Sequence, residues 1–431
     1  MTAMVPVRMY ATWRPLAGLL VAQGSALTAN RILLVTLPWL VLTSTGSPAR
    51  TGLIAMCQVV PFVLVQALSG PLLDRISARR VSAAGDIVSA VAIMLLTVPG
   101  TPPLWMLGVI AAVIGAADGP ATAAKAVLVP GATAAAGQPL ERGTGITTAV
   151  ERAATAAGPA LAGLLIATQG VDTALRMAAT MLAVAALSGA AIRDRRRRQA
   201  GPGGNYVQRL REGAVFLHTD RSLRAIVAMI VVSNFLDQAF LTVLLPVWAR
   251  DHGLGAEVVG LAISAFATAS VGTALLAAWI GNRLPRRCTY LIGFTISGVS
   301  RLVVLAWGAP PVVVLAVFAV AGLGSGLVNP IISALTYERV PAALYGRVNT
   351  LITAWAWSGI PFGGLAGAAL LSATGLSASL WFCSAAYLMA VLRPGWRVQW
   401  HAPSESDLEP ISLNRAAATP EPEVSRPRGA P

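Results

Sequence analysis

The stretch SGPLLDRISARRV, Ser69–Val81, places one acidic and three basic residues between two apolar runs of the chain. The four charged residues are Asp74, Arg75, Arg79 and Arg80. A helix needs ~20 mainly apolar residues to cross the ~30 Å hydrocarbon layer of a bilayer. The stretch therefore predicts a charged turn at the water interface that joins two membrane-spanning helices.

The composition of the whole chain extends this prediction. Of its 431 residues, 55% are hydrophobic and 12% are charged, whereas soluble proteins carry about 25% charged residues. A soluble protein of this composition would expose large apolar patches. We therefore predict an all-α integral membrane protein with the lipid bilayer as its solvent and twelve transmembrane helices, at 16–43, 52–73, 81–99, 104–128, 144–168, 172–192, 224–248, 257–281, 288–307, 311–335, 346–372 and 376–393.

Basic residues are distributed unevenly among the turns. The net charge is +14, but it is dispersed in short segments between apolar runs, so a nucleic-acid partner is not expected. Alternate turns are rich in Arg, as is the run Arg193–Arg198, whereas the other turns hold only Arg50, Arg176 and Arg250. By the positive-inside rule, both termini are predicted to be cytoplasmic in a multi-pass protein of the inner (plasma) membrane.

The two halves of the sequence resemble each other. The turn LLDRISARRV is echoed by WIGNRLPRRC, Trp279–Cys288, and GPALAG, Gly158–Gly163, by GIPFGGLAG, Gly359–Gly367. We interpret this internal similarity as two six-helix repeats that run in the same direction. The predicted organisation is a cytoplasmic N-terminus at 1–15, a first bundle at 16–192, a basic cytoplasmic linker with an amphipathic helix at 193–223, a second bundle at 224–394 and a cytoplasmic disordered tail at 395–431.

Asp74 needs an explanation beyond orientation, because acidic residues contribute little to topology. A carboxylate at a helix end can accept hydrogen bonds from a neighbouring helix N-terminus and pair with a basic side chain. Such a contact would latch the two halves together only while the inner face is shut. Arg75, Arg79 and Arg80 could instead be simple topology determinants.

Several motifs of the chain resemble those of one known family. GPLLDRISARR resembles the helix 2–3 loop signature of the major facilitator superfamily, and AAKAVLVP, GPALAGLL and VPAALYGRVNT follow in order. With WLVLTSTGSPARTGL and LREGAVFLHTDRSLRA, the resemblance covers about 380 residues. Together they are similar to the subgroup of macrolide-type and siderophore-type exporters. The resemblance implies the major facilitator fold, with Gly70, Lys125 and Arg347 grouped around the latch acid Asp74. It also implies that Gly158 and Pro159 form the helix 5 signature of exporters, where Pro bends the helix.

Ionisable residues inside membrane spans are costly and usually functional. The candidates for binding protons or substrate are Asp237, Asp118, Glu151, Arg31 and Arg301. Each could instead pair with a neighbour. Relatives often carry an acid where this chain has Asn30, which favours Asp237 as the proton site. Trp residues near the predicted interfaces are typical of an aromatic belt. Trp355 and Trp357 lie deeper in their predicted helix and cannot share one face, so one of them could stack on a cyclic substrate.

Neither an enzyme nor a cofactor protein is indicated. The sequence has no phosphate-binding Gly-Lys-Ser/Thr loop and no His/Cys cluster, so no ATP, metal or other cofactor is expected. The favoured function is export of a small amphipathic compound, such as an antibiotic, siderophore or other secondary metabolite, by alternating access in exchange for protons, with the chain acting as a monomer. Two alternatives stay open: a metabolite importer or facilitator, and a non-transporting receptor or scaffold.

Overall fold

The computed structural model describes residues 13–98, 102–190, 214–280, 285–340 and 342–397. Every element in these ranges is helical. Eleven of the helices are long and apolar enough to cross a membrane. The prediction of an all-α integral membrane protein is therefore confirmed. A further helix, α4 (Ala78–Leu95), has fewer apolar residues because it carries Arg79, Arg80 and Asp86, and it completes the twelve predicted spans.

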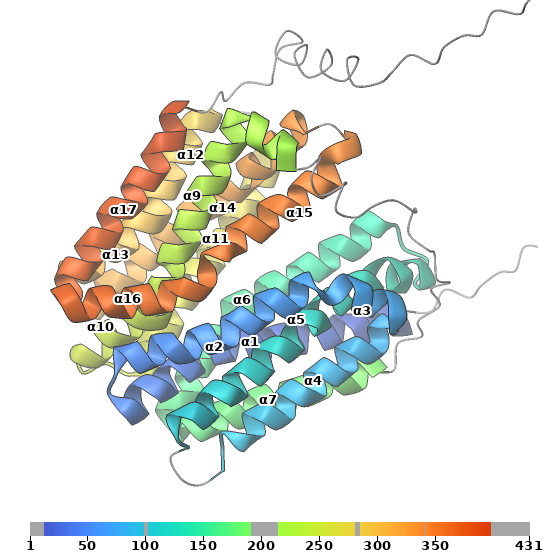
Figure 1. The fold of residues 1–431 in the computed structure, drawn as a ribbon, viewed down its shortest axis with the longest axis horizontal. Coiled ribbons are helices and arrows are strands. Elements are labelled where there is room, and N and C mark those ends of the chain that lie inside the picture. Colours follow the sequence, from blue (N-terminus) through green and yellow to red (C-terminus); the bar gives the residue numbers. More distant parts are fainter. Residues whose placement is uncertain (1–12, 99–101, 191–213, 281–284, 341, 398–431) are drawn as a thin grey trace, which may run out of the picture.

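The first half of the chain forms one group of packed helices (Figure 1). They are α1 (Arg14–Thr45), α2 (Pro48–Ala67), α3 (Ser69–Arg75), α4, α5 (Leu104–Ala135), α6 (Leu140–Gln169) and α7 (Val171–Ala190). Helix α1 packs against α6 and α7, and α5 packs against α2 and α4. The apolar run predicted to end at residue 73 is broken at Leu68, so α3 is a separate short helix that contains Asp74.

The second half repeats this plan with more interruptions. It contains α9 (Arg221–Ala239), α11 (Ala256–Ile280), α12 (Arg286–Phe294), α14 (Pro311–Arg339), α15 (Ala342–Ser358), α16 (Ile360–Thr374) and α17 (Leu376–Arg397). Helix α9 continues through a π-helical turn, η1 (Phe240–Leu244), into α10 (Leu245–Asp251), and α12 continues through η3 (Thr295–Val299) into α13 (Ser300–Ala306).

Several helices extend beyond the predicted spans. Helix α5 ends at Ala135 instead of residue 128, and α6 begins at Leu140 instead of residue 144. Hydropathy marks only the part of a helix that lies in hydrocarbon, whereas the hydrogen-bonded backbone continues into the polar layer. Of the predicted linker at 193–223 the structure describes residues 214–223, of which 214–219 are helical and 221–223 begin α9. Phe216 and Leu217 are buried against Leu223 and Val340.

The two halves meet through glycine-rich helix faces. Helix α6 packs against α11, and α2 packs against α16. The motifs that repeat in the sequence lie at these contacts: Gly163 faces the start of α11, and Gly364 faces Gly52 of α2. Figure 1 shows the halves together near α10 and α16 and diverging toward α3 and the start of α15. Close backbone contact thus joins the halves at one end of the molecule.

Candidate functional site

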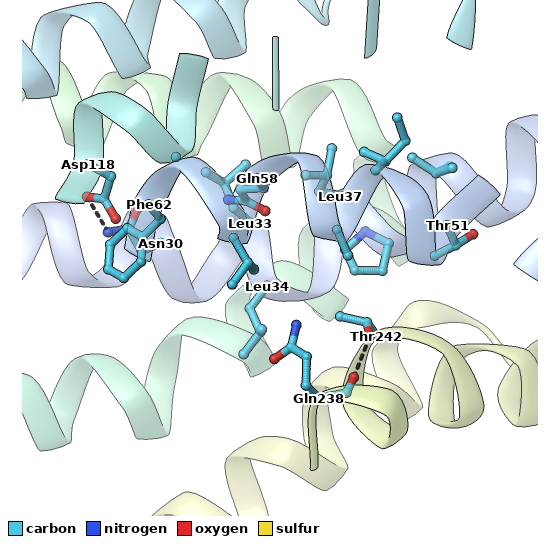
Figure 2. Close-up of a pocket in the computed structure, with 16 residues that line it drawn as sticks. Asn30, Leu33, Leu34, Leu37, Thr51, Gln58, Phe62, Asp118, Gln238 and Thr242 are labelled. Carbon is cyan, nitrogen blue, oxygen red and sulfur yellow. Dashed lines mark hydrogen bonds between the residues drawn. The ribbon is translucent and has the colours of Figure 1, made fainter. Parts of the chain in front are cut away.

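A cavity of about 150 Å³ lies between α1, α2, α5 and the second half. Its polar wall is formed by Asn30, Gln58 and Asp118, with Gln238 and Thr242 contributed by the second half (Figure 2). The Nδ2 of Asn30 donates a hydrogen bond of 2.9 Å to Oδ1 of Asp118. Among the described residues, no basic side chain lies within ion-pair distance of this carboxylate. Asp118 is therefore an acid held by a neutral amide at the edge of a cavity.

A second cavity, of about 190 Å³, lies on another side of α1. Three arginines line it, Arg31 from α1, Arg152 from α6 and Arg301 from α13, together with aromatic residues that include Phe266 and Phe318. Leu34 of α1 lines both cavities. The adjacent residues Asn30 and Arg31 thus face two neighbouring cavities of different charge.

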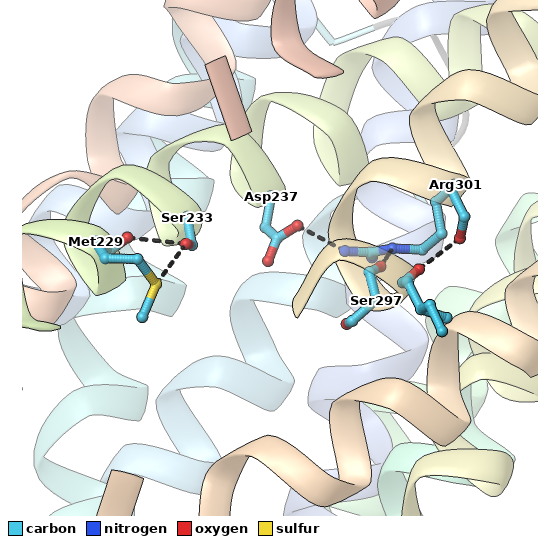
Figure 3. A network of polar contacts seen from close by, with 7 residues as sticks. Met229, Ser233, Asp237, Ser297 and Arg301 are labelled. Carbon is cyan, nitrogen blue, oxygen red and sulfur yellow. Dashed lines mark hydrogen bonds and ion pairs between the residues drawn. The ribbon is translucent and has the colours of Figure 1, made fainter. Parts of the chain in front are cut away.

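The predicted candidates Asp237 and Arg301 form an ion pair with each other. Nη2 of Arg301 lies 2.8 Å from Oδ1 of Asp237, and Nε of Arg301 donates to the carbonyl of Ser297 (Figure 3). The guanidinium carbon also lies 4.6 Å and 5.4 Å from the ring centres of Phe266 and Phe240. The Arg301 side chain is 6% exposed and that of Asp237 34%, so the carboxylate remains accessible.

Both members of this ion pair adjoin a π-helical turn. Asp237 precedes η1 and Arg301 follows η3. A π-helical turn contains an extra residue and rotates the side chains that follow it, and such turns are frequent at functional sites. Gly298 in η3 lies against the ring of Tyr387, where a Cβ atom would overlap that ring. The local backbone therefore fixes the direction in which Arg301 points.

The Gly158–Pro159 signature contributes close packing to the site. Helix α6 continues through Pro159 without interruption. Gly158 lies against the side chain of Arg31, where a Cβ atom would overlap it. The backbone N–H of Ala160 donates a hydrogen bond of 2.8 Å to Oγ of Ser264 on α11. Because Pro interrupts regular backbone pairing in a helix, α6 uses this amide to bind the other half.

The remaining cavity candidates lie apart. Glu151 is exposed and lines neither cavity, although it acts electrostatically on Arg31. Trp357 stacks on Phe62 across the two halves, with ring centres 5.6 Å apart, and Phe62 lines the Asp118 cavity. Trp355 is 54% exposed. As the sequence required, these two Trp residues face different directions.

Three of the predicted latch residues, Arg75, Arg79 and Lys125, have side chains that the structure describes. Lys125 has a different partner from the one that the sequence suggested: its Nζ lies 2.7 Å from Oδ1 of Asp86 on α4. Nη1 of Arg79 donates to the Ala190 carbonyl at the end of α7, and Arg75 is exposed. The side chains of Gly70, Asp74 and Arg347 lie outside the described set, so the latch stays a prediction.

Sequence reasoning missed several residues of these cavities. Gln58, Phe62 and Gln238 are ordinary residues of apolar helices and have no motif around them. Arg152 was overlooked beside Glu151, although the cost of a charge in a membrane span was a usable signal. Ser264 could not have been found, because its role depends on the neighbouring helix. Among the described residues, no group of His, Cys, Asp and Glu side chains could hold a metal ion.

Comparison with known proteins shows which family the chain resembles. The family model described as Major Facilitator Superfamily matches residues 19–221 and 227–410. The multidrug efflux pump Tap of Mycobacterium bovis (strain BCG / Pasteur 1173P2) is 30% identical over 376 residues, which cover 84% of this chain and 88% of that protein. The Tap pump of Mycolicibacterium fortuitum is 28% identical over 383 residues, covering 85% of this chain and 91% of that protein.

Solved structures share the fold at low identity. The nucleoside transporter NupG has a TM-score of 0.74 and 13% identity, covering 89% of this chain and 99% of that chain. A bacterial homologue of the human lysosomal transporter Spinster has a TM-score of 0.63 and 13% identity, covering 93% of this chain and all of that chain. The protein is a multi-pass membrane transporter and not an enzyme. Its chain belongs to the Major Facilitator Superfamily.

Proposed function

We propose that this protein exports small amphipathic compounds in exchange for protons, by alternating access of a central site to the two sides of the membrane. The proposal is carried by a difference among the acidic residues of the membrane spans, namely which of them have a basic partner. Asp86 and Asp237 each have a basic partner at ion-pair distance. Asp118 instead accepts a hydrogen bond from the neutral Asn30 on the wall of a cavity between the halves.

Asp118 is suited to exchange a proton for a substrate group. An acid without a charged partner can be neutral or ionised according to what else occupies its surroundings. A proton and a positive or hydrogen-bond-donating group of a substrate would compete for the same carboxylate, which is the requirement for antiport. We therefore assign the coupling proton to Asp118, although the sequence favoured Asp237.

Export is the direction favoured by the relatives. The Tap proteins are named as multidrug efflux pumps, and they align with most of this chain. The cavity also offers apolar side chains such as Leu33, Leu37 and Phe62 beside its polar wall, and this combination suits an amphipathic compound. The positive-inside pattern of the sequence supports a location in the cell membrane with both termini cytoplasmic.

The test compares Asp118→Asn with the wild-type protein in proteoliposomes that load ethidium or another amphipathic dye under an imposed pH gradient. Asp118→Asn is expected to remove the dependence of transport on the pH gradient. The control is a double variant that combines Asp237→Asn with Arg301→Gln. It removes a complete ion pair and should keep part of the dependence of transport on the pH gradient. The proposal fails if Asp118→Asn transports with the wild-type dependence, or if the wild-type protein moves no cationic, neutral or zwitterionic dye.

A further inference from the structure

The arginine-lined cavity is unusual for the interior of a membrane protein. Arg31, Arg152 and Arg301 come from three helices of both halves and face a space of about 190 Å³, and none of the described residues that line it is acidic. A charged side chain inside the membrane is costly and is normally paired or functional. Asp237 balances the charge of Arg301. The half-buried Arg31 and the exposed Arg152 have no ion-pair partner in the part of the chain that the structure describes, so these two charges call for a negative group to balance them.

Two of these arginines are available to a ligand. Arg301 is held by Asp237, Ser297 and two aromatic rings. In contrast, within the described part of the chain the guanidinium groups of Arg31 and Arg152 make no hydrogen bond and no ion pair. Glu151 and Asp118 attract Arg31 over a longer distance, and Arg152 repels it. Both guanidinium groups therefore retain donors for an anion.

The rest of the wall favours an apolar body beside that anion. Phe266, Phe318 and Ile263 face the cavity from α11 and α14. Leu34 lines both this cavity and the Asp118 cavity, so the two spaces lie on either side of one side chain. The two volumes together reach only the lower part of the ~300–1,000 Å³ typical of ligand pockets. A compound that fits here would extend past Leu34 with one end near Asp118.

We propose that Arg31 and Arg152 bind the anionic group of the transported compound, a carboxylate or sulfonate carried on an aromatic or aliphatic body. The inference rests on the proposed export function. An anion alone would not compete with a proton for Asp118. The substrate class is therefore a zwitterionic amphipath, whose acid group lies at the arginines and whose amine lies at Asp118. Guanidinium groups suit this task because they bind carboxylate-like groups through two parallel hydrogen bonds.

The experiment is calorimetric titration of the purified full-length protein, in an uncharged detergent, with naphthalene-2-sulfonate as the anionic probe. The matched neutral and cationic probes are 2-naphthylmethanol and 2-naphthylmethylammonium. Arg31→Gln and Arg152→Gln are each expected to weaken binding of the sulfonate roughly tenfold, because each removes a charge-assisted hydrogen bond. Binding of the neutral probe should not change in either variant.

Arg176→Gln is the matched control, because Arg176 is exposed on α7 and lines neither cavity. It should bind all three probes like the wild-type protein. Arg31→Lys keeps the positive charge and the aliphatic stem that packs on Gly158. It should retain most of the sulfonate affinity. This variant tests the site if Arg31→Gln does not fold.

Two outcomes would overturn the proposal: sulfonate affinity that is unchanged in both glutamine variants, or a wild-type protein that binds the cation more tightly than the sulfonate. Dye transport by the same wild-type preparation separates this failure from a failure of the export function. Transport with arginine-independent binding refutes only the anion site. Absence of transport refutes the export function, whatever the binding result.

Discussion

At the residue scale, Asp86 and Lys125 form a buried ion pair in which each charge is balanced by the other. Asp86 is 1% exposed and Lys125 5%, and a single bond of 2.7 Å joins them. Lys offers a compact charge on a flexible stem, so it cannot bind both carboxylate oxygens as the planar fork of Arg does. The second oxygen of Asp86, Oδ2, is buried and has no hydrogen-bond partner among the described residues.

Removing one member of this pair should cost more stability than removing both. We expect Asp86→Asn to destabilise the protein by about 3 kcal/mol, because it leaves the Lys125 charge buried and unpaired. The combination of Asp86→Leu and Lys125→Met should unfold close to the wild-type temperature. Thermal unfolding in detergent measures both effects. A double variant as unstable as Asp86→Asn would show that the pair itself contributes the stability.

At the element scale, the helices of the two halves approach each other through glycine. A Cβ atom at Gly260 of α11 would overlap the carbonyl of Pro159 on α6. One at Gly163 would lie 2.7 Å from the Cα of Glu257. Small residues permit such close backbone approach in membranes, where association depends on packing and hydrogen bonds rather than on the hydrophobic effect. The Ala160–Ser264 hydrogen bond lies in the same contact.

Gly260→Ala is therefore expected to separate the adjoining ends of α6 and α11. Electron resonance distances between spin labels at Thr168 and His252, both exposed, should gain a longer component. Gly272→Ala is the control on the same helix, because a Cβ atom there meets nothing within 4 Å. That variant should keep the wild-type distances and gain up to about 1 kcal/mol of helix stability. Identical distances in the two variants would contradict this account of the contact.

At the scale of the whole molecule, the halves are joined at one end and diverge at the other (Figure 1). The hydrogen bond from Nη1 of Arg250 to the Gly46 carbonyl lies at the joined end, as do the glycine contacts. Alternating access needs a second arrangement in which the opposite end is joined. Helix α3, which contains Asp74, lies at the diverging end and is the place where a latch would act in that arrangement.

Asp74→Ala is expected to shift the equilibrium toward the arrangement described here. One spin label at the exposed native Cys288 and one at position 138 report the separation of the two halves at the diverging end. The short-distance component should decrease in Asp74→Ala. It should stay unchanged in Asp172→Ala, whose exposed residue lies in the first turn of α7. If both variants match the wild-type protein, Asp74 does not act as a latch.

Much of the architecture could be predicted from the order of residues. Apolar runs of spanning length give the twelve helices, because bilayer thickness fixes how many residues must be apolar. Repeated motifs such as Gly158–Gly163 and Gly359–Gly367 indicated paired halves, and both lie at contacts between them. Asp237, Asp118, Arg31 and Arg301 were identified as candidates because a charge in hydrocarbon is conspicuous.

Only the tertiary structure decided the partners of these charges. The sequence determined which residues must avoid lipid, since that cost belongs to each residue alone. It could not decide that Arg301 binds Asp237, that Asn30 binds Asp118, or that Lys125 binds Asp86. Those pairings join helices that are distant along the chain, and they depend on how each helix is rotated, including the extra residues of η1 and η3. Helix rotation is set by packing between helices, which no local pattern of residues specifies.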